Sequence, residues 1–149
     1  QCAVIEFARH VLKYEDAHTT EIAEDSKFPV ISMMEEQKSI SNLGGTMRLG
    51  QYKCQLKPDT KVALAYNTES IEERHRHRYE FNNEYLEAFE KAGMIATGKN
   101  PETGLVEVVE IPDHPWFVGA QYHPEYKSTV DNPHPLFVAF VKAALENQK

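Results

Sequence analysis

The strictest constraint on the fold of this chain is an alternation of charged and ring side chains over residues 74–81. The order is R-H-R-H-R-Y-E-F, so charged groups occupy every second position and rings fill the positions between them. Successive side chains of a β-strand point to opposite faces of a sheet, whereas a helix would spread both kinds around its surface. The segment is therefore predicted to be a strand with arginines on one face and rings on the other.

Helical spacing of apolar residues predicts four helices. They cover residues 1–14, residues 59–66 with Asp59 as the cap, a segment capped near Asn82 or Asn83 that ends at Gly93, and a last helix from Pro135. The positions of the last two helices that should face inward are Leu86, Phe89, Ala92, Leu136, Phe140, Val141, Ala144 and Leu145.

Short apolar runs bounded by turn residues predict strands over residues 28–34, 105–111 and 116–122. The last run is nearly all apolar, as expected of a strand buried on both faces of a parallel sheet. Residues 15–27 are polar without a period, which predicts a loop. The glycines at 44, 45 and 50 suggest a hairpin or a close backbone approach. Strands mixed with helices indicate an α/β or mixed-sheet domain.

Composition excludes several classes of protein. The chain has 149 residues and a formal net charge of −7, which predicts one domain and disfavours a general nucleic-acid binder. No apolar run approaches the roughly 20 residues that span a bilayer, and no signal peptide opens the chain. Two cysteines without a C-x-x-C pair indicate reduced thiols and a cytoplasmic protein. Because the chain opens on Gln1, inside a helical pattern, we expect a piece of a longer protein.

Chemistry is expected where the run 116–122 ends, in the sequence H-P-E. Sites of open α/β sheets lie at the carboxyl ends of the strands. In an extended segment Glu125 would lie on the same side as His123 and reach a ring nitrogen of its imidazole. A carboxylate that orients an imidazole is the base half of a nucleophilic triad. The same two residues also fit an ordinary surface loop.

Two other charged features are compatible with an amino-acid ligand. One arginine of the R-H-R-H-R run is suited to grip a carboxylate through its planar fork, and Glu21 in a polar loop is suited to an ammonium group. The plainer interpretation is a solvated strand face and a surface acid. A metal site built from the histidines of the run lacks a third ligand nearby. His114 and His134 are interpreted as structural, and Cys2 as a buried, inert thiol.

Six segments in order resemble the C-terminal part of CTP synthases, in their class I glutamine amidotransferase domain. They are Q-C-A-V-I-E-F-A-R-H-V (1–11), L-G-G-T-M-R-L-G (43–50), E-R-H-R-H-R-Y-E-F-N-N (73–83), D-H-P-W-F-V (113–118), Q-Y-H-P-E-Y (121–126) and H-P-L-F-V-A-F-V-K-A-A (134–144). H-P-E recurs widely in class I amidotransferases, whereas the second and third segments are much more specific to CTP synthases. The resemblance implies an α/β, flavodoxin-like open mixed sheet flanked by helices and truncated at its N-terminal side.

The resemblance also assigns roles to residues. It makes His123 and Glu125 the catalytic pair, and Glu21 and Arg78 contacts of the substrate glutamine. It makes Gln1 the last residue of a glutamine-contacting turn. All five positions match residues of the family's motifs.

The family's nucleophile does not match any residue of the chain. It is the cysteine of a G-I-C-L-G-M-Q elbow, four residues before the position of Gln1, and Cys2 lies five positions too late. The oxyanion glycine and the amidoligase domain, which binds ATP, UTP and magnesium in the family, also fall outside these residues. We therefore expect residues 1–149 to be the C-terminal portion of a glutaminase domain, inactive alone and with no cofactor or metal of its own.

In the family, a cysteine thiolate attacks the side-chain amide of L-glutamine, and the ammonia replaces the 4-oxygen of UTP, activated by ATP, to give CTP. The implied partners are L-glutamine, the amidoligase domain and a homotetramer, without nucleic acid or membrane. Two alternatives stay open. One is a non-catalytic module that binds an amino acid or a partner protein. The other is a different class I amidotransferase or a γ-glutamyl hydrolase, against which the R-H-R-H-R-Y-E block argues.

Overall fold

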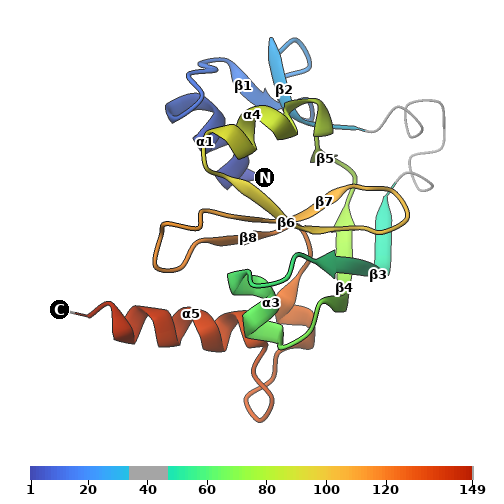
Figure 1. Ribbon diagram of the computed structural model, residues 1–149. Helices are drawn as coiled ribbons and strands as arrows, with labels where there is room; N and C mark the ends of the chain where they lie inside the picture. Colours follow the sequence, from blue (N-terminus) through green and yellow to red (C-terminus); the bar gives the residue numbers. More distant parts are fainter. Residues whose placement is uncertain (34–46, 149) are drawn as a thin grey trace. The chain divides into compact units, whose positions relative to one another are not determined.

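The computed structural model describes residues 1–33 and 47–148. The chain forms two compact units, the first from residues 1–49 and 76–92 and the second from residues 50–75 and 93–149. Each unit contains strands and helices (Figure 1). The glycines at 44 and 45, for which the sequence suggests a hairpin, lie outside the described residues.

The first unit contains a three-stranded mixed sheet. Strands β1, β2 and β5 lie in the order β1-β2-β5, and the β1–β2 pair is parallel while the β2–β5 pair is antiparallel. Their bounds are Ala17–Thr19, Phe28–Ser32 and Glu80–Phe81. The described part of the run 28–34 is thus a strand as predicted, whereas β1 lies inside the segment 15–27 that was predicted to be a loop. Three residues are too few for an alternation to be recognised in the sequence.

Three helices accompany this sheet. They are α1 (Cys2–His10), which contacts β1 and β2, the 3₁₀ helix η1 (Asn83–Tyr85) and α4 (Leu86–Lys91). The predicted cap at Asn82 is confirmed, because its side-chain oxygen accepts a hydrogen bond from the backbone N–H of Glu84 at 3.1 Å. Helix α1 ends four residues before the predicted position, ahead of a left-handed residue, Lys13, with φ 62°.

Aromatic rings fill the core of the first unit. The ring of Phe7 stacks on Phe89 with centroids 5.6 Å apart, and Phe81 meets Phe89 edge-on at 5.3 Å. Of the inward positions predicted for α4, Phe89 is buried and Leu86 half-buried, but Ala92 is exposed. Helical spacing fails at Ala92 because the helix has already ended at Lys91.

The second unit is built on the five-stranded sheet, in the order β4-β3-β6-β7-β8. The pairs β3–β6, β6–β7 and β7–β8 are antiparallel. The strands are β3 (Arg48–Leu56), β4 (Ser70–His77), β6 (Ile95–Lys99), β7 (Val106–Glu110) and β8 (Val118–Ala120).

The structure corrects the interpretation of residues 116–122. The strand β8 spans only Val118–Ala120, is half-buried and lies at the edge of the sheet, antiparallel to β7. It is therefore not the parallel strand buried on both faces that was predicted. The flanking residues Trp116 and Tyr122 pack against the core of this unit instead, so the run is apolar because its ends are covered.

Helices α3 (Lys61–Tyr66), η2 (Pro124–Lys127) and α5 (Pro135–Glu146) complete the second unit. The cap of α3 is Thr60, whose hydroxyl accepts from the backbone of the helix, and not Asp59 as predicted. The core of the unit consists of Cys54, Leu56, Val62, Ala63, Ile71, Val108, Tyr122 and Leu136.

The inward face predicted for α5 is largely wrong. Leu136 is buried, but Phe140, Val141 and Leu145 are each more than half exposed, and Ala144 is exposed as well. Helix α5 lies against α3 within this unit, and that contact covers only part of its apolar surface (Figure 1). Among the described residues, no helix has the length and apolar character to cross a bilayer.

Strands β3 and β6 were not recognised in the sequence. Strand β6 contains Gly98, at which a Cβ atom would lie 2.8 Å from both the sulfur of Cys54 and a methyl group of Val108. A glycine inside a strand often marks such a close approach. It also weakens the pattern of side chains from which a strand is recognised.

Candidate functional site

The H-P-E sequence forms a direct contact between imidazole and carboxylate. Nδ1 of His123 lies 2.7 Å from Oε1 of Glu125. The contact does not arise from an extended segment, as predicted, because Pro124 and Glu125 open the 3₁₀ helix η2 and His123 is its N-cap residue. The histidine side chain is 34% exposed and the glutamate side chain 56%, so both groups reach solvent.

This contact lowers the pKa of Glu125 and fixes which ring nitrogen of His123 carries the proton. The hydrogen bond from His123 is the main cause that holds the pKa of the Glu125 carboxyl below its ordinary value. An ionised carboxylate only accepts hydrogen bonds, so Nδ1 of His123 carries the proton. In the neutral ring Nε2 then has a lone pair and can act as a base. This is the arrangement of base and orienting acid in a nucleophilic triad.

Two further contacts fix the histidine. Its backbone N–H donates to the carbonyl oxygen of Arg74 on β4 at 2.9 Å. Its ring stacks on Tyr126 with centroids 4.9 Å apart. The backbone is therefore held by a strand and the ring by a neighbour on η2, which limits the orientations available to the imidazole.

The R-H-R-H-R run forms a strand, as predicted, but with different bounds. Strand β4 starts at Ser70 and ends at His77, and its residues alternate between exposed and buried as far as His75. Arg74 and Arg76 are exposed, and His75 is buried. Arg78 follows the end of the strand, where it is half-buried.

The residues expected to hold glutamine fall in the first unit. The side-chain amide of Gln1 donates to the carbonyl oxygen of Tyr79 at 3.0 Å, next to Arg78 in the sequence. Glu21 lies in the turn after β1, where it is exposed, and its backbone N–H donates to the hydroxyl of Thr19. Within this unit Gln1 is therefore tied to the segment that contains Arg78. His123 and Glu125 belong to the second unit.

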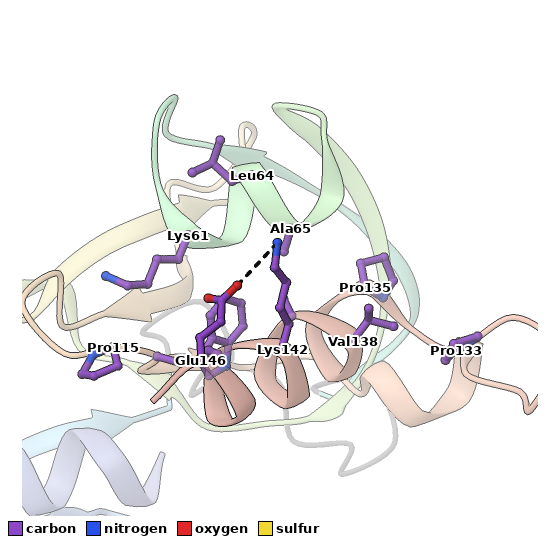
Figure 2. A pocket seen from close by; sticks show the side chains of 12 residues that line it. Lys61, Leu64, Ala65, Pro115, Pro133, Pro135, Val138, Lys142 and Glu146 are labelled. Carbon is purple, nitrogen blue, oxygen red and sulfur yellow. Dashed lines mark ion pairs between the residues drawn. The ribbon is translucent and has the colours of Figure 1, made fainter. Parts of the chain in front are cut away.

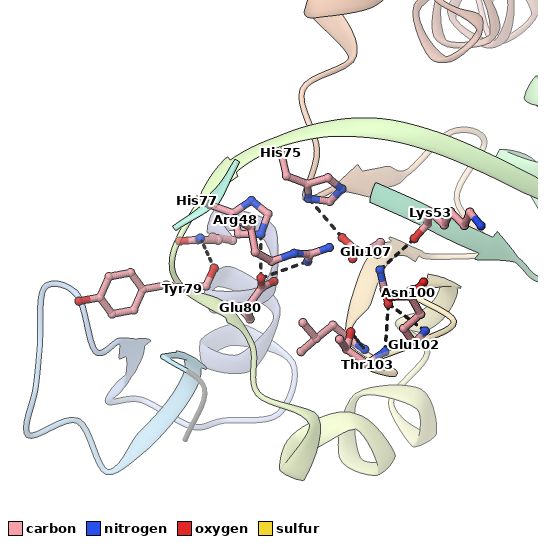
Figure 3. Close-up of polar contacts among 12 residues, drawn as sticks. Arg48, Lys53, His75, His77, Tyr79, Glu80, Asn100, Glu102, Thr103 and Glu107 are labelled. Carbon is pink, nitrogen blue, oxygen red and sulfur yellow. Dashed lines mark hydrogen bonds and ion pairs between the residues drawn. The ribbon is translucent and has the colours of Figure 1, made fainter. Parts of the chain in front are cut away.

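A buried ionic cluster of the first unit was missed at the sequence level. Oε1 of Glu80 lies 3.1 Å from Nη1 of Arg48 and 2.9 Å from Nε2 of His77 (Figure 3). The side chain of Glu80 is 1% exposed. His77 and Glu80 bracket Arg78 in the sequence, so the cluster fixes the backbone on both sides of it. The signal in the sequence that could have indicated this cluster is Glu80, an acidic residue directly before the buried Phe81.

A second buried pair lies in the other unit. Nδ1 of His75 is 3.5 Å from Oε2 of Glu107, and neither side chain is exposed (Figure 3). The two histidines of the run thus face different carboxylates, Glu107 and Glu80. In the described parts of the chain, no three histidine, cysteine, aspartate or glutamate side chains form a group that could hold a metal ion.

The two cysteines differ in their surroundings. Cys54 is buried in the core of the second unit. Cys2 is exposed, which corrects the prediction of a buried thiol. It is the first residue of α1, and the buried positions of that helix begin only at Val4.

His114 and His134 have structural contacts, as predicted. Nδ1 of His114 accepts the backbone N–H of Trp116 at 3.1 Å. Nδ1 of His134 accepts the backbone N–H of Leu136 at 3.2 Å and so caps α5.

A pocket of about 650 Å³ lies elsewhere in the second unit (Figure 2). Helices α3 and α5 and the segment around Pro115 form its walls. Lys61, Lys142 and Glu146 are its charged lining residues. Neither His123 nor Glu125 lines it, so the candidate catalytic pair and this pocket are separate features.

Comparison with known proteins gives consistent matches along the chain. The sequence model of the family "Glutamine amidotransferase class-I" matches residues 1–143. The CTP synthase of Bacteroides thetaiotaomicron is 62% identical over 149 residues, which are 100% of this chain and 28% of that protein. The CTP synthase of Christiangramia forsetii is 60% identical over 147 residues, 99% of this chain and 27% of that protein. The chain thus spans less than a third of these relatives.

A solved structure matches as well. It is the glutaminase domain of the Trypanosoma brucei CTPS with bound acivicin, with a TM-score of 0.89 and 33% sequence identity. The match covers 100% of this chain and 58% of that one. It agrees with the expected mixed α/β fold of a glutaminase domain.

Proposed function

Since the chain belongs to the class-I glutamine amidotransferase family, we propose that it supplies the base and the substrate-binding residues for hydrolysis of L-glutamine in a CTP synthase. The observation that carries the proposal is the 2.7 Å contact between Nδ1 of His123 and Glu125. Family membership alone does not specify the reaction of the complete enzyme. The 60–62% identity to CTP synthases supports glutamine-dependent CTP synthesis as that reaction.

In the proposed reaction, Nε2 of His123 takes the proton of a cysteine thiol as its sulfur attacks the side-chain amide carbon of glutamine. The carbon–nitrogen bond then breaks, and the imidazolium returns the proton to the leaving ammonia. Water hydrolyses the resulting thioester to glutamate and regenerates the thiol. Glu125 holds the ring and stabilises the imidazolium while it is charged.

The proposal locates the nucleophile outside these 149 residues. Cys54 is buried among apolar side chains, and Cys2 lies five positions beyond the place where the family's cysteine stands. We therefore expect the 149-residue chain by itself to release no ammonia from glutamine.

Glutamine as a substrate presents an ammonium and a carboxylate group besides its amide. We assign the ammonium to Glu21, which is exposed, and the carboxylate to Arg78, which can form two parallel hydrogen bonds to it. Gln1, which hydrogen-bonds next to Arg78, belongs to the same set. Oppositely charged groups for the two ends of the substrate are what an amino-acid ligand requires.

In the complete enzyme, the proposal assigns the synthesis of CTP from UTP to an amidoligase domain that uses ATP, magnesium and the released ammonia. None of residues 1–149 is assigned to ATP or to magnesium. A homotetramer in the cytoplasm belongs to the same proposal, because it follows from the resemblance to CTP synthases.

The test uses a chimera in which this chain replaces the matched 149 residues of the Bacteroides thetaiotaomicron CTP synthase. CTP formation is measured with glutamine and, separately, with ammonium chloride. In the chimera, His123→Ala should lower the glutamine-dependent rate by about 10³-fold or more and leave the ammonia-dependent rate unchanged. A His123→Ala chimera that still uses glutamine at the original rate would show that His123 is not the base.

A further inference from the structure

A buried carboxylate, Glu73, lies on β4 next to Arg74, the residue whose carbonyl oxygen binds the backbone of His123. The side chain of Glu73 on β4 is 3% exposed. Its Oε1 lies 2.9 Å from the hydroxyl of Tyr66 and 3.1 Å from Nε2 of His134, and its Oε2 lies 3.7 Å from Nζ of Lys127. Removing an ionised carboxylate from water is costly unless it is paired and hydrogen-bonded. These three contacts therefore offset the cost of burying the Glu73 carboxylate.

The three partners do not have the same role. Nδ1 of His134 accepts the backbone N–H of Leu136, so the proton of the neutral ring is on Nε2, which faces Glu73. Tyr66 also donates as a neutral group, because burial is the main cause that raises the pKa of its hydroxyl. The positive charge opposite Glu73 comes from Lys127.

Lys127 is the last residue of η2, the short helix that contains Glu125. Its ammonium group also donates to the carbonyl oxygen of Glu72. At the other end of the segment, the backbone N–H of His123 donates to the carbonyl oxygen of Arg74. Both ends of residues 123–127 are thus attached to three consecutive residues of β4.

We propose that Glu73 is a positioning residue for glutamine hydrolysis, because through Lys127 it holds η2 against β4 and so keeps Glu125 in contact with Nδ1 of His123. This proposal depends on the proposed role of His123 and Glu125. An ion pair as exposed as theirs has little strength of its own to keep its geometry. The alignment therefore depends on the backbone that carries the two side chains and on the stacking of the His123 ring on Tyr126.

The first test is the Glu73→Gln variant of the chimera. The amide side chain at position 73 keeps an oxygen that can accept hydrogen bonds from Tyr66 and His134. It removes the negative charge opposite Lys127. We expect kcat for glutamine-dependent CTP formation to fall about tenfold, while KM for glutamine stays within about twofold, because a displaced base slows the chemical step and leaves binding intact. The ammonia-dependent rate should not change.

Lys127→Gln tests the same link from a partly exposed side chain. It should lower kcat at least as much as Glu73→Gln, because it also removes the hydrogen bond to the carbonyl oxygen of Glu72. The double variant should lower kcat no further than Lys127→Gln alone, because both substitutions break the contact between Lys127 and Glu73. Lys127→Arg keeps the charge and should restore most of the rate. Lys142→Gln on α5 is the matched control. Lys142 pairs with Glu146 on the same exposed helix face, so its loss should leave kcat unchanged.

A spectroscopic measurement on the 149-residue chain separates positioning from a general loss of structure. The pKa of the Glu125 carboxyl can be followed by ¹³C NMR of its Cδ atom. In Glu73→Gln and Lys127→Gln this pKa should rise toward its ordinary value, because the contact with His123 is occupied less of the time. The thermal midpoints and the NMR shifts of core residues should show that the variants are folded.

The outcomes distinguish this proposal from the proposed function. If His123→Ala abolishes glutamine use but folded Glu73→Gln and Lys127→Gln change neither kcat nor the pKa of Glu125, then Glu73 is not a positioning residue. If His123→Ala leaves glutamine use intact, the proposed function itself is wrong. Should Glu73→Gln fail to fold, Lys127→Gln decides the matter alone.

Discussion

Nδ1 of His123 and Oε1 of Glu125 lie 2.7 Å apart at the start of one short 3₁₀ helix, η2. The helix brings a carboxylate to an imidazole two residues earlier in the chain, and Pro124 between them restricts the backbone. The pair therefore depends on local structure, and the attachments of this segment to β4 fix its place in the second unit.

The contact predicts a pH dependence for the stability of the chain. The pKa of Glu125 is lowered from 4.5 by its hydrogen bond with His123. A lowered folded-state pKa contributes stability that is present above the unfolded-state value and is lost as the pH falls through the folded-state value. The free energy of unfolding of the chain should therefore exceed that of Glu125→Gln at pH 6, and the difference should shrink as the pH falls below 4.5 and through the lowered folded-state pKa. A difference that persists unchanged at pH 3 would contradict an ionic contact.

Arg78 should decide how tightly glutamine binds. In the chimera, Arg78→Lys keeps the charge but loses the planar fork, and we expect KM for glutamine to rise about tenfold with little change of kcat. Arg76→Lys on the exposed face of β4 is the matched control and should leave KM unchanged. Equal effects of the two substitutions would mean that Arg78 is not a specific substrate contact.

The Arg48–Glu80 ion pair should stabilise the first unit. Arg48→Met leaves the carboxylate of Glu80 buried without its guanidinium partner, which we expect to cost about 3 kcal/mol of unfolding free energy in urea. Arg48→Met combined with Glu80→Gln should recover part of this loss, because no charge is then stranded. Arg74→Met on an exposed position serves as the control. If Arg48→Met lowers the unfolding free energy no more than Arg74→Met does, the Arg48–Glu80 ion pair does not stabilise the first unit.

Gly98 should tolerate no side chain. An alanine there would bring its Cβ to 2.8 Å from Cys54 and Val108 in the core of the second unit, and we expect a loss of about 1–3 kcal/mol. Gly119→Ala on β8 is a milder comparison, since its nearest side-chain neighbour is a methyl group of Val109 at 3.1 Å. Thermal unfolding of both variants measures the difference. An unchanged midpoint for Gly98→Ala would show that Cys54 and Val108 can shift to accommodate the extra methyl group.

Much of the local structure could be predicted where a pattern of side chains has a single physical cause. The alternation around His75 predicted β4, because only an extended chain separates arginines from rings. Asn82 and Gly93 predicted the limits of the helical segment between them, because one caps backbone N–H groups and the other adopts a positive φ.

Other features depend on tertiary contacts that leave no pattern in the sequence. The run 116–122 is apolar throughout, and the sequence does not tell a central parallel strand from an edge strand whose flanks are covered. The apolar positions of α5 predicted a buried helix, but within α5 only Leu136 is buried.

The contact between His123 and Glu125 could be predicted from the sequence, but its support could not. H-P-E indicates a histidine and an acid in contact, and the structure has that contact. Glu73 lies two positions before His75 on β4, on the same buried face of the strand. The alternation could therefore have predicted a buried acid at this position. Its link to Lys127 was not, because 54 positions separate the two residues and the contact exists only in the folded unit.

The most direct test of whether this chain supplies part of a glutaminase is the activity of the unmodified chimera with the two nitrogen sources. We expect it to form CTP from glutamine with a kcat/KM within about tenfold of the Bacteroides thetaiotaomicron enzyme, and from ammonia at the same rate as that enzyme. A chimera that forms CTP from ammonia at the normal rate but not from glutamine would contradict the claim.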